Sequence, residues 1–117
     1  MKIELITIGK KSPSWLKNGI EEYQRRMPQE LRIAVKEIPL PKRTKSRSSE
    51  HCIKVEAEKI KGALAPDSRT VAMDLKGKAW STKELAGQLT RWMLDYQSVQ
   101  FVVGGPDGLA RDIVASA

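Results

Sequence analysis

The strongest constraint on the fold is an alternation of short β-type runs with stretches of helical periodicity. Three runs are apolar and rich in β-branched residues, at residues 3–8, 70–75 and 99–103, as is typical of buried strands. A fourth, at residues 31–38, alternates apolar and polar side chains, as a half-exposed strand does. Strands joined by helices predict an α/β fold, a parallel sheet with helices on both faces.

Three stretches between these runs place apolar side chains at helical spacing, so each predicts a helix with one face on the sheet. The expected sheet-facing stripe of the first helix is Leu16, Ile20, Tyr23 and Met27. That of the second is Ile53, Ala57, Ile60 and Leu64. The third helix follows Ser81 and Glu84, which have capping-box spacing, and its stripe is Leu85, Leu89, Trp92 and Tyr96.

Length and composition bound the kind of protein. A chain of 117 residues with 40% hydrophobic and 30% charged residues predicts one folded domain spanning residues 1–117. No apolar run approaches the roughly 20 residues that cross a bilayer, which argues against a membrane protein. The single cysteine, Cys52, cannot form an internal disulfide, and neither a cysteine cluster nor a histidine pair is present to bind a metal. We therefore expect a cytoplasmic protein without a metal.

The net charge of +7 lies entirely in the first half of the chain. Residues 1–62 hold 15 basic and 8 acidic residues, whereas residues 63–117 hold 6 of each. Such an excess favours a polyanionic partner, most often nucleic acid. Residues 39–49 predict a loop with four basic side chains, Lys42, Arg43, Lys45 and Arg47. These four either contact phosphates or form a solvated charge run, and the sequence leaves both interpretations open.

Two strand ends carry the candidate ligand-binding residues. Gly104, Gly105 and Gly108 follow the run at 99–103, and glycines allow close backbone approach and positive φ. The turn lacks the spacing of a dinucleotide fingerprint and the lysine of a P-loop, so it is either a ligand loop or a tight strand-to-helix connection. Met73 and Asp74 end the run at 70–75 and should lie at the same sheet edge, because ligands of α/β sheets bind beyond the carboxyl ends of the strands.

Three further residues have simpler interpretations. Asp74 is expected to be solvated beside its turn. His51 and Cys52 have no third partner at useful spacing, so catalysis by a nucleophilic pair is improbable.

These motifs together resemble the bacterial RlmH family, the ribosomal RNA large subunit methyltransferase H enzymes of the SPOUT superfamily. The likeness runs from Met1 to Ala117 in order. Its most specific parts are residues 22–26 (Glu-Tyr-Gln-Arg-Arg), the Lys-Gly-Lys turn at 76–78 and the Gly-Gly-Pro-Asp-Gly-Leu turn at 104–109. Met73 stands where the family more often has leucine, a volume-conserving change that we expect to be tolerated.

The resemblance implies a methyltransferase that acts on N3 of a pseudouridine in 23S rRNA of the assembled ribosome. It implies S-adenosylmethionine as cofactor, a trefoil-knot fold and a homodimer. Met73 and Gly104 match cofactor-contacting positions of the family, and Gly105 and Gly108 shape the same loop. A methyl group on sulfonium is already activated, so transfer needs in-line positioning and a deprotonated N3, and no protein nucleophile is expected.

Family members continue for roughly a further third of this length, into the segment that completes the knot. The resemblance therefore predicts that this chain lacks the knot-forming carboxyl-terminal part and binds S-adenosylmethionine weakly. We also expect Ile113 and Val114, in the helical pattern after Gly108, to be exposed. The competing class is a non-catalytic basic RNA-binding or ribosome-associated protein, or an inactive fragment of the methyltransferase, which cofactor binding would distinguish. A nucleotide-dependent oxidoreductase is disfavoured by the missing fingerprint.

Overall fold

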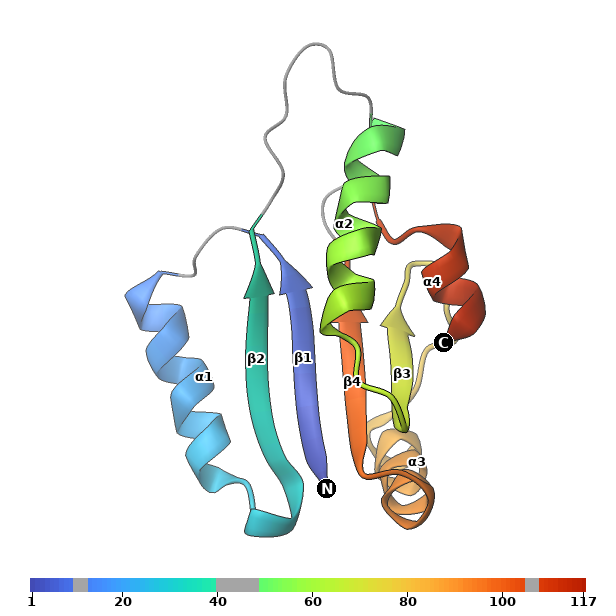
Figure 1. Cartoon of the computed structure of the whole chain (residues 1–117). Helices are drawn as coiled ribbons and strands as arrows, with labels where there is room; N and C mark the ends of the chain where they lie inside the picture. Colours follow the sequence, from blue (N-terminus) through green and yellow to red (C-terminus); the bar gives the residue numbers. More distant parts are fainter. Residues whose placement is uncertain (10–12, 40–48, 105–107) are drawn as a thin grey trace.

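Four strands form one all-parallel sheet in the computed structural model, which describes residues 1–9, 13–39, 49–104 and 108–117. The order across the sheet is β2-β1-β4-β3, with all pairings parallel (Figure 1). The strands are β1 (Lys2–Ile8), β2 (Arg32–Ile38), β3 (Ser68–Met73) and β4 (Ser98–Val103). The carboxyl ends of all four strands therefore meet at one edge, and the predicted parallel α/β architecture is confirmed.

Four helices connect and follow these strands. They are α1 (Ser14–Arg26), α2 (Ser49–Ala63), α3 (Thr82–Asp95) and α4 (Arg111–Ser116), and a short 3₁₀ helix, Gln29–Leu31, precedes β2. Side chains alternate along each strand, so even-numbered residues form one sheet face and odd-numbered residues the other. The even-numbered face packs against α2 and α4, and we call it the α2/α4 face. The opposite, α1/α3 face contacts α1 and α3. Among the described residues, no helix is long and apolar enough to cross a membrane.

A cluster of buried apolar residues lies on the α2/α4 face, and Ile3, Val99 and Trp92 are buried on the opposite face. Ile6 of β1, Ile60 of α2 and Ile113 of α4 are each no more than 1% exposed. They pack with Ala57 and Val102 in one cluster, with Leu64 against it, which confirms Ala57, Ile60 and Leu64 of the stripe predicted for the second helix, whereas Ile53 is only half-buried. The expectation that Ile113 would be exposed is wrong.

The reason for that error is that α4, although short, docks on the same face as α2. Its Asp112 forms an ion pair with Lys61 of α2, and Ile113 inserts between the helix and the sheet. Val114 is half-buried, so it is less exposed than expected too.

A buried glutamine lies at the amino-terminal end of this face. Gln100 of β4, 1% exposed, donates hydrogen bonds to Glu4 Oε2 at 3.0 Å and to the carbonyl of Ala63 at 3.2 Å. Its Oε1 accepts from the Ala65 amide at 2.9 Å and from the Ser68 hydroxyl at 2.8 Å. One amide thus joins the two central strands to the connection between α2 and β3.

Glu4 is held in its ionised form beside that amide. Burial raises the pKa of Glu4, but hydrogen bonds from Lys2 and Gln100 and the charges of Lys2 and Lys36 lower it by more, so the net pKa is below its ordinary value. At neutral pH the carboxylate is therefore ionised and accepts from Gln100.

The α1/α3 face is covered less completely. None of the residues of α1 is buried. Its sheet side meets β2 through Ile20 and through Gln24, whose Nε2 donates to the carbonyl of Ile33 at 3.0 Å. The predicted inward stripe is wrong for Leu16, 39% exposed, and Tyr23, 69% exposed. The helix runs beside β2, an edge strand (Figure 1), so only a narrow part of its surface meets the sheet.

α3 packs through aromatic side chains. Ser81 caps its first turn by accepting from the Glu84 amide at 3.1 Å, as the capping-box spacing predicts. Trp92 is 5% exposed and lies edge-on to Phe101 of β4, with 6.4 Å between ring centroids. Trp80 continues the contact at 6.1 Å from Trp92.

Candidate functional site

Two of the predicted cofactor residues, Met73 and Gly104, lie side by side. Met73 ends β3 and pairs with Val103, the last residue of β4, and Gly104 follows Val103 directly. The Met73 side chain is 53% exposed and that of Val103 38%. An apolar shelf and a glycine backbone therefore meet at the carboxyl edge of two neighbouring strands.

The glycine turn is shaped by contacts within the chain. A Cβ at Gly104 would lie 2.8 Å from the carbonyl carbon of Gly108 and 3.0 Å from the Leu109 side chain, closer than side chains can approach. Gly108 has a φ of +88°, in the left-handed region that favours glycine. Both residues are thus required by the turn itself. Gly105 lies outside the described residues.

Asp74 serves its own turn. Its carboxylate accepts from the Lys76 amide at 3.2 Å, and its carbonyl accepts from the Gly77 amide at 3.0 Å. This local role supports the interpretation that Asp74 is a turn residue. It also fixes the chain directly after Met73.

The predicted phosphate-binding residues Lys42, Arg43, Lys45 and Arg47 lie outside the described residues, but the ends of their segment are placed. β2 ends at Ile38 and α2 begins at Ser49, both at the carboxyl edge of the sheet (Figure 1). The Gly9 amide donates to the Ile38 carbonyl at 3.1 Å. Gly9 is followed directly by a second group of basic residues, Lys10 and Lys11. Two basic segments therefore leave the sheet from adjacent points.

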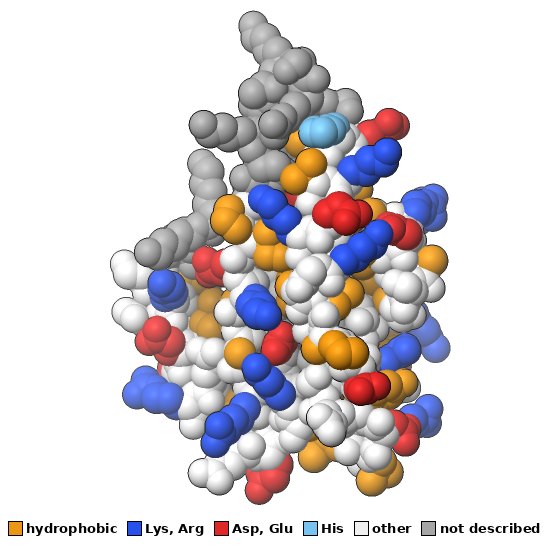
Figure 2. Space-filling model, in the orientation of Figure 1, with side chains coloured by type: hydrophobic (Ala, Val, Ile, Leu, Met, Phe, Trp, Pro, Cys, Tyr) orange, Lys and Arg blue, Asp and Glu red, His pale blue; other side chains and the backbone are white. Residues whose placement is uncertain are grey.

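These two segments account for most of the excess charge. They contain six basic and no acidic residues, against a net charge of +7 for the chain. On the described part of the face in Figure 2, basic and acidic side chains are interspersed. Most of the net positive charge thus lies in two short segments of the sequence. Both segments join the described chain at the sheet edge that carries Met73 and Gly104.

The described residues offer little for nucleophilic or metal chemistry. Cys52 is 1% exposed, so its thiol is withheld from any substrate in solvent, whereas His51 is exposed. Among the described residues, no three His, Cys, Asp or Glu side chains gather to hold a metal ion.

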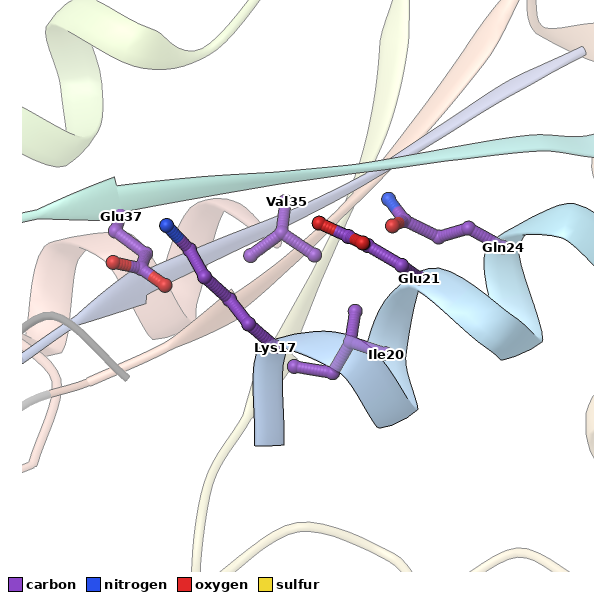
Figure 3. Close-up of a pocket in the computed structure, with 6 residues that line it drawn as sticks. All are labelled: Lys17, Ile20, Glu21, Gln24, Val35 and Glu37. Carbon is purple, nitrogen blue, oxygen red and sulfur yellow. The ribbon is translucent and has the colours of Figure 1, made fainter. Parts of the chain in front are cut away.

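A cavity lies elsewhere, between α1 and β2. It has a volume of about 320 Å³ and is lined by Lys17, Ile20, Glu21, Gln24, Val35 and Glu37 (Figure 3). β2 and β3 are opposite edges of the sheet, and neighbouring strands are about 4.8 Å apart. This cavity is therefore well separated from Met73.

Sequence reasoning missed the exposure of two aromatic residues of α1, Tyr23 and Trp15. Trp92, in the stripe predicted to face the sheet, is 5% exposed, and Trp80 is 40% exposed. Trp15, however, is 74% exposed, near the start of α1. The sequence did contain a signal for the exposure of Trp15, because basic residues flank it: Lys17 lies two residues later, and the segment from Lys10 to Ser12 ends three residues earlier.

Comparison with known proteins identifies relatives over the whole chain. Residues 1–117 match the family described as "Predicted SPOUT methyltransferase". The chain is 42% identical over 115 residues to "Ribosomal RNA large subunit methyltransferase H" of Stutzerimonas stutzeri, covering 98% of this chain and 74% of that protein. It is 43% identical over 117 residues to the protein of the same name from Paraburkholderia phymatum, covering 100% and 75%. The Pseudomonas putida protein of that name is 41% identical over 117 residues, covering 100% and 76%.

Proposed function

The chain belongs to the SPOUT methyltransferase family, and from that premise we propose that it methylates N3 of a pseudouridine in 23S rRNA, using S-adenosylmethionine. The observation that carries this proposal is the meeting of Met73 and Gly104 at one sheet edge, from which the two basic segments also leave. The relatives named as ribosomal RNA large subunit methyltransferases support ribosomal RNA as the substrate. We propose further that the protein acts on ribosomes in the cytoplasm as a homodimer.

The residues at this edge fit the proposed cofactor. Met73 and Val103 offer exposed apolar surface to an adenosine, and the backbone of Gly104 lies beside it without a side chain. Met73, Gly104, Gly105 and Gly108 would hold the group. When bound, S-adenosylmethionine supplies a methyl group already activated on sulfonium sulfur. The chain's own task is then to orient that group and exclude water, which needs a rigid shelf and no protein nucleophile.

The basic segments supply the attraction for RNA in this proposal. Lys42, Arg43, Lys45 and Arg47 would contact phosphates. The other basic segment, which leaves the sheet from an adjacent point, adds Lys10 and Lys11. Phosphate contacts position a nucleic acid without reading its sequence. The base to be methylated would accordingly be brought to the edge where the cofactor lies.

A methyl-transfer assay tests the proposal. Two proteins are compared: the chain itself, and the chain extended by the carboxyl-terminal quarter of a relative, the part that lies outside the match. Each is given ribosomes and radiolabelled S-adenosylmethionine. Label at N3 of one pseudouridine of 23S rRNA is the expected result. In the extended protein, Met73→Asp should abolish methyl transfer, because a carboxylate would replace the apolar shelf. Met73→Leu should retain methyl transfer. Met93→Asp, at a 42% exposed methionine of α3, is the matched control.

Binding of RNA without cofactor affinity in either form would instead support the non-catalytic alternative. Calorimetry with S-adenosylmethionine separates the two, and it also measures whether the extended form binds more tightly, as the family resemblance implies.

Neutralising the basic segment tests the RNA part. Replacing Lys42, Arg43, Lys45 and Arg47 by glutamine should weaken rRNA binding and reduce its salt dependence. Each lost phosphate contact lowers the slope of log K against log salt by about 0.9 on a duplex. An unchanged slope would assign these side chains to solubility.

A further inference from the structure

The edge strand β2 has a strip of open surface on its α2/α4 side. In Figure 1, α2 lies in front of the central strands and α4 lies beside β3, so neither of these helices covers the amino-terminal part of β2. The even-numbered residues of β2 are on this side. Arg32 and Lys36 are exposed, and Ala34 between them is half-buried. This strip of the sheet is therefore accessible to a partner.

Two strands place three basic side chains along the strip. Lys2 of β1 is the register partner of Arg32, and Lys36 lies four residues further along β2, about 13 Å away in a strand. All three residues are exposed. The Arg32 side chain makes no hydrogen bond or ion pair with the part of the chain that the structure describes, so its guanidinium is available to a ligand.

The helix above the sheet adds a fourth cation. Lys61 of α2 forms an ion pair with Asp112 of α4, which fixes the side of α2 that faces α4. Lys59 is two residues away, about 200° around the helix, so it projects from the opposite side, toward β2. Lys59 is exposed, and its ammonium has no partner among the described residues. We call Lys2, Arg32, Lys36 and Lys59 the β2 basic face.

The carboxylates near this face leave its positive charge in excess. Glu4 lies beneath it, with Oε1 3.0 Å from Lys2 Nζ and Oε2 4.0 Å from Lys36 Nζ. Its side chain is only 11% exposed, and one carboxylate cannot neutralise two lysines.

The acidic side chains of the helices on this side of the sheet are placed elsewhere. Glu58 and Asp112 both pair with Lys61, on the side of α2 that faces α4. Glu56 of α2 is 2% exposed, so it presents no carboxylate at the surface. A ligand that approaches the β2 basic face therefore meets mainly cations.

We propose that the β2 basic face binds the phosphate backbone of the RNA substrate. This inference rests on the proposed function and adds a second contact surface to it. β2 leads directly into the segment that holds Lys42 to Arg47, so a phosphate chain held by that segment can continue along the strand. Lysine and arginine side chains without an aromatic ring among them suit contact with phosphates more than with bases.

The charge of this surface, rather than that of the whole chain, determines the class of partner. Two copies that met through it in a symmetric contact would place the same cations against each other, which is unfavourable, whereas phosphates are complementary to it. The proposed homodimer remains free to use another surface. Glu4 also holds Lys2 and Lys36 in place, which reduces the side-chain freedom that binding would cost.

Paired substitutions distinguish this surface from net charge. Arg32→Gln combined with Lys59→Gln removes the two cations of the face that have no partner. Lys83→Gln combined with Arg91→Gln removes two exposed cations of α3, on the other side of the sheet, and is the control with the same change in net charge. The probe is a fluorescein-labelled RNA hairpin with a stem of about 16 base pairs, followed by anisotropy between about 50 and 300 mM salt.

We expect the Arg32/Lys59 pair of substitutions to weaken hairpin binding about tenfold or more at about 100 mM salt. The slope of log K against log salt should fall by up to about 1.8, the value for two lost phosphate contacts on a duplex. The Lys83/Arg91 control should weaken binding less than about twofold. Both double variants should melt and sediment as the parent does, because all four side chains are exposed.

Several results would overturn this inference while leaving methyl transfer intact. Equal losses of affinity in the two double variants would reduce the effect to net charge, and no loss in either would remove the surface from RNA binding. Weaker binding to whole ribosomes with unaltered hairpin binding would assign the face to an acidic protein. Altered sedimentation of the Arg32/Lys59 variant alone would assign it to a second copy. Absence of methyl transfer and of any RNA binding by the parent would instead overturn the proposed function.

Discussion

The two faces of the sheet are built differently. On the α2/α4 face, Ile6, Ile60 and Ile113 are almost fully buried, and a polar network is completed around Gln100. On the α1/α3 face, α1 has no buried residue, and large apolar side chains such as Trp15 and Leu94 remain exposed. Ile3, Val99 and Trp92 are buried on this face as well, so the difference between the faces lies mainly at α1, which packs against the sheet without a buried residue.

The largest expected effect is a difference between two isoleucines. Ile60→Ala should lower the free energy of unfolding by about 3 to 4 kcal/mol, because it leaves a cavity in a closed core. Ile20→Ala, at a half-buried position of α1, should lower it by about 1 kcal/mol. Urea unfolding measures both, with Ile60→Val as the conservative control. Equal losses would show that the two faces contribute equally.

Next in size is the loss of the buried amide. Gln100→Leu should cost about 2 to 3 kcal/mol, because it leaves the Ala65 amide without its acceptor and removes the hydrogen bonds that Gln100 makes with Ser68 and Glu4. Gln97→Leu is the matched control on the exposed surface and should change stability by less than about 0.5 kcal/mol. A loss no larger than this at Gln100 would mean that water replaces the amide.

A smaller effect belongs to the α1/α3 face. Ser81→Ala removes the acceptor for the Glu84 amide at the start of α3 and should cost about 1 kcal/mol. Ser81→Asp keeps an acceptor at the same place and should be close to neutral. Thermal unfolding followed by circular dichroism distinguishes them. If both variants unfold alike, the cap does not stabilise α3.

The smallest effect concerns the exposed ion pair of α4. The hydrogen bond that Lys61 donates to the Asp112 carboxylate lowers the pKa of Asp112 and raises the pKa of Lys61. Because the folded pKa of Asp112 is below its unfolded value, the pair stabilises the fold above about pH 4 and ceases to do so as pH falls through the folded pKa.

Asp112→Asn should therefore be less stable than the parent at pH 7, and the difference should shrink as pH falls through the lowered folded pKa of Asp112. Melting temperatures at low salt over this fall in pH measure the gap, with Asp95→Asn as control. A gap that persists unchanged at the lowest pH would show that the charge of Asp112 is not its cause. The effect is small because both side chains are exposed.

Topology explains what was predictable. Four strand runs, the capping box at Ser81 and the neighbouring positions of Met73 and Gly104 follow from local patterns, since parallel strands end at one edge. The strand predicted at 70–75 is Ser68–Met73 in the structure, because the Asp74 turn ends it early. Local sequence does not show this boundary clearly.

Contacts distant in sequence explain what was not predictable. The outward position of Tyr23 depends on α1 lying against an edge strand, where few partners exist for its apolar side. The burial of Ile113 depends on the space left beside Ile60, 53 residues earlier in the chain. The phosphate-binding role of Lys42 to Arg47 and the cofactor role of the glycine turn remain predictions.

Gln100 also determines which alignment of the central strands is the stable one. β1 and β4 consist mostly of apolar residues, so sliding one past the other by two residues would keep every side chain on its own face and preserve much of the hydrophobic contact. Such a slip would move Glu4 opposite Ser98 or Val102 in place of Gln100 and would break the hydrogen bond between the Gln100 amide and the Glu4 carboxylate. The buried pair therefore favours the native alignment of the two strands over a slipped one.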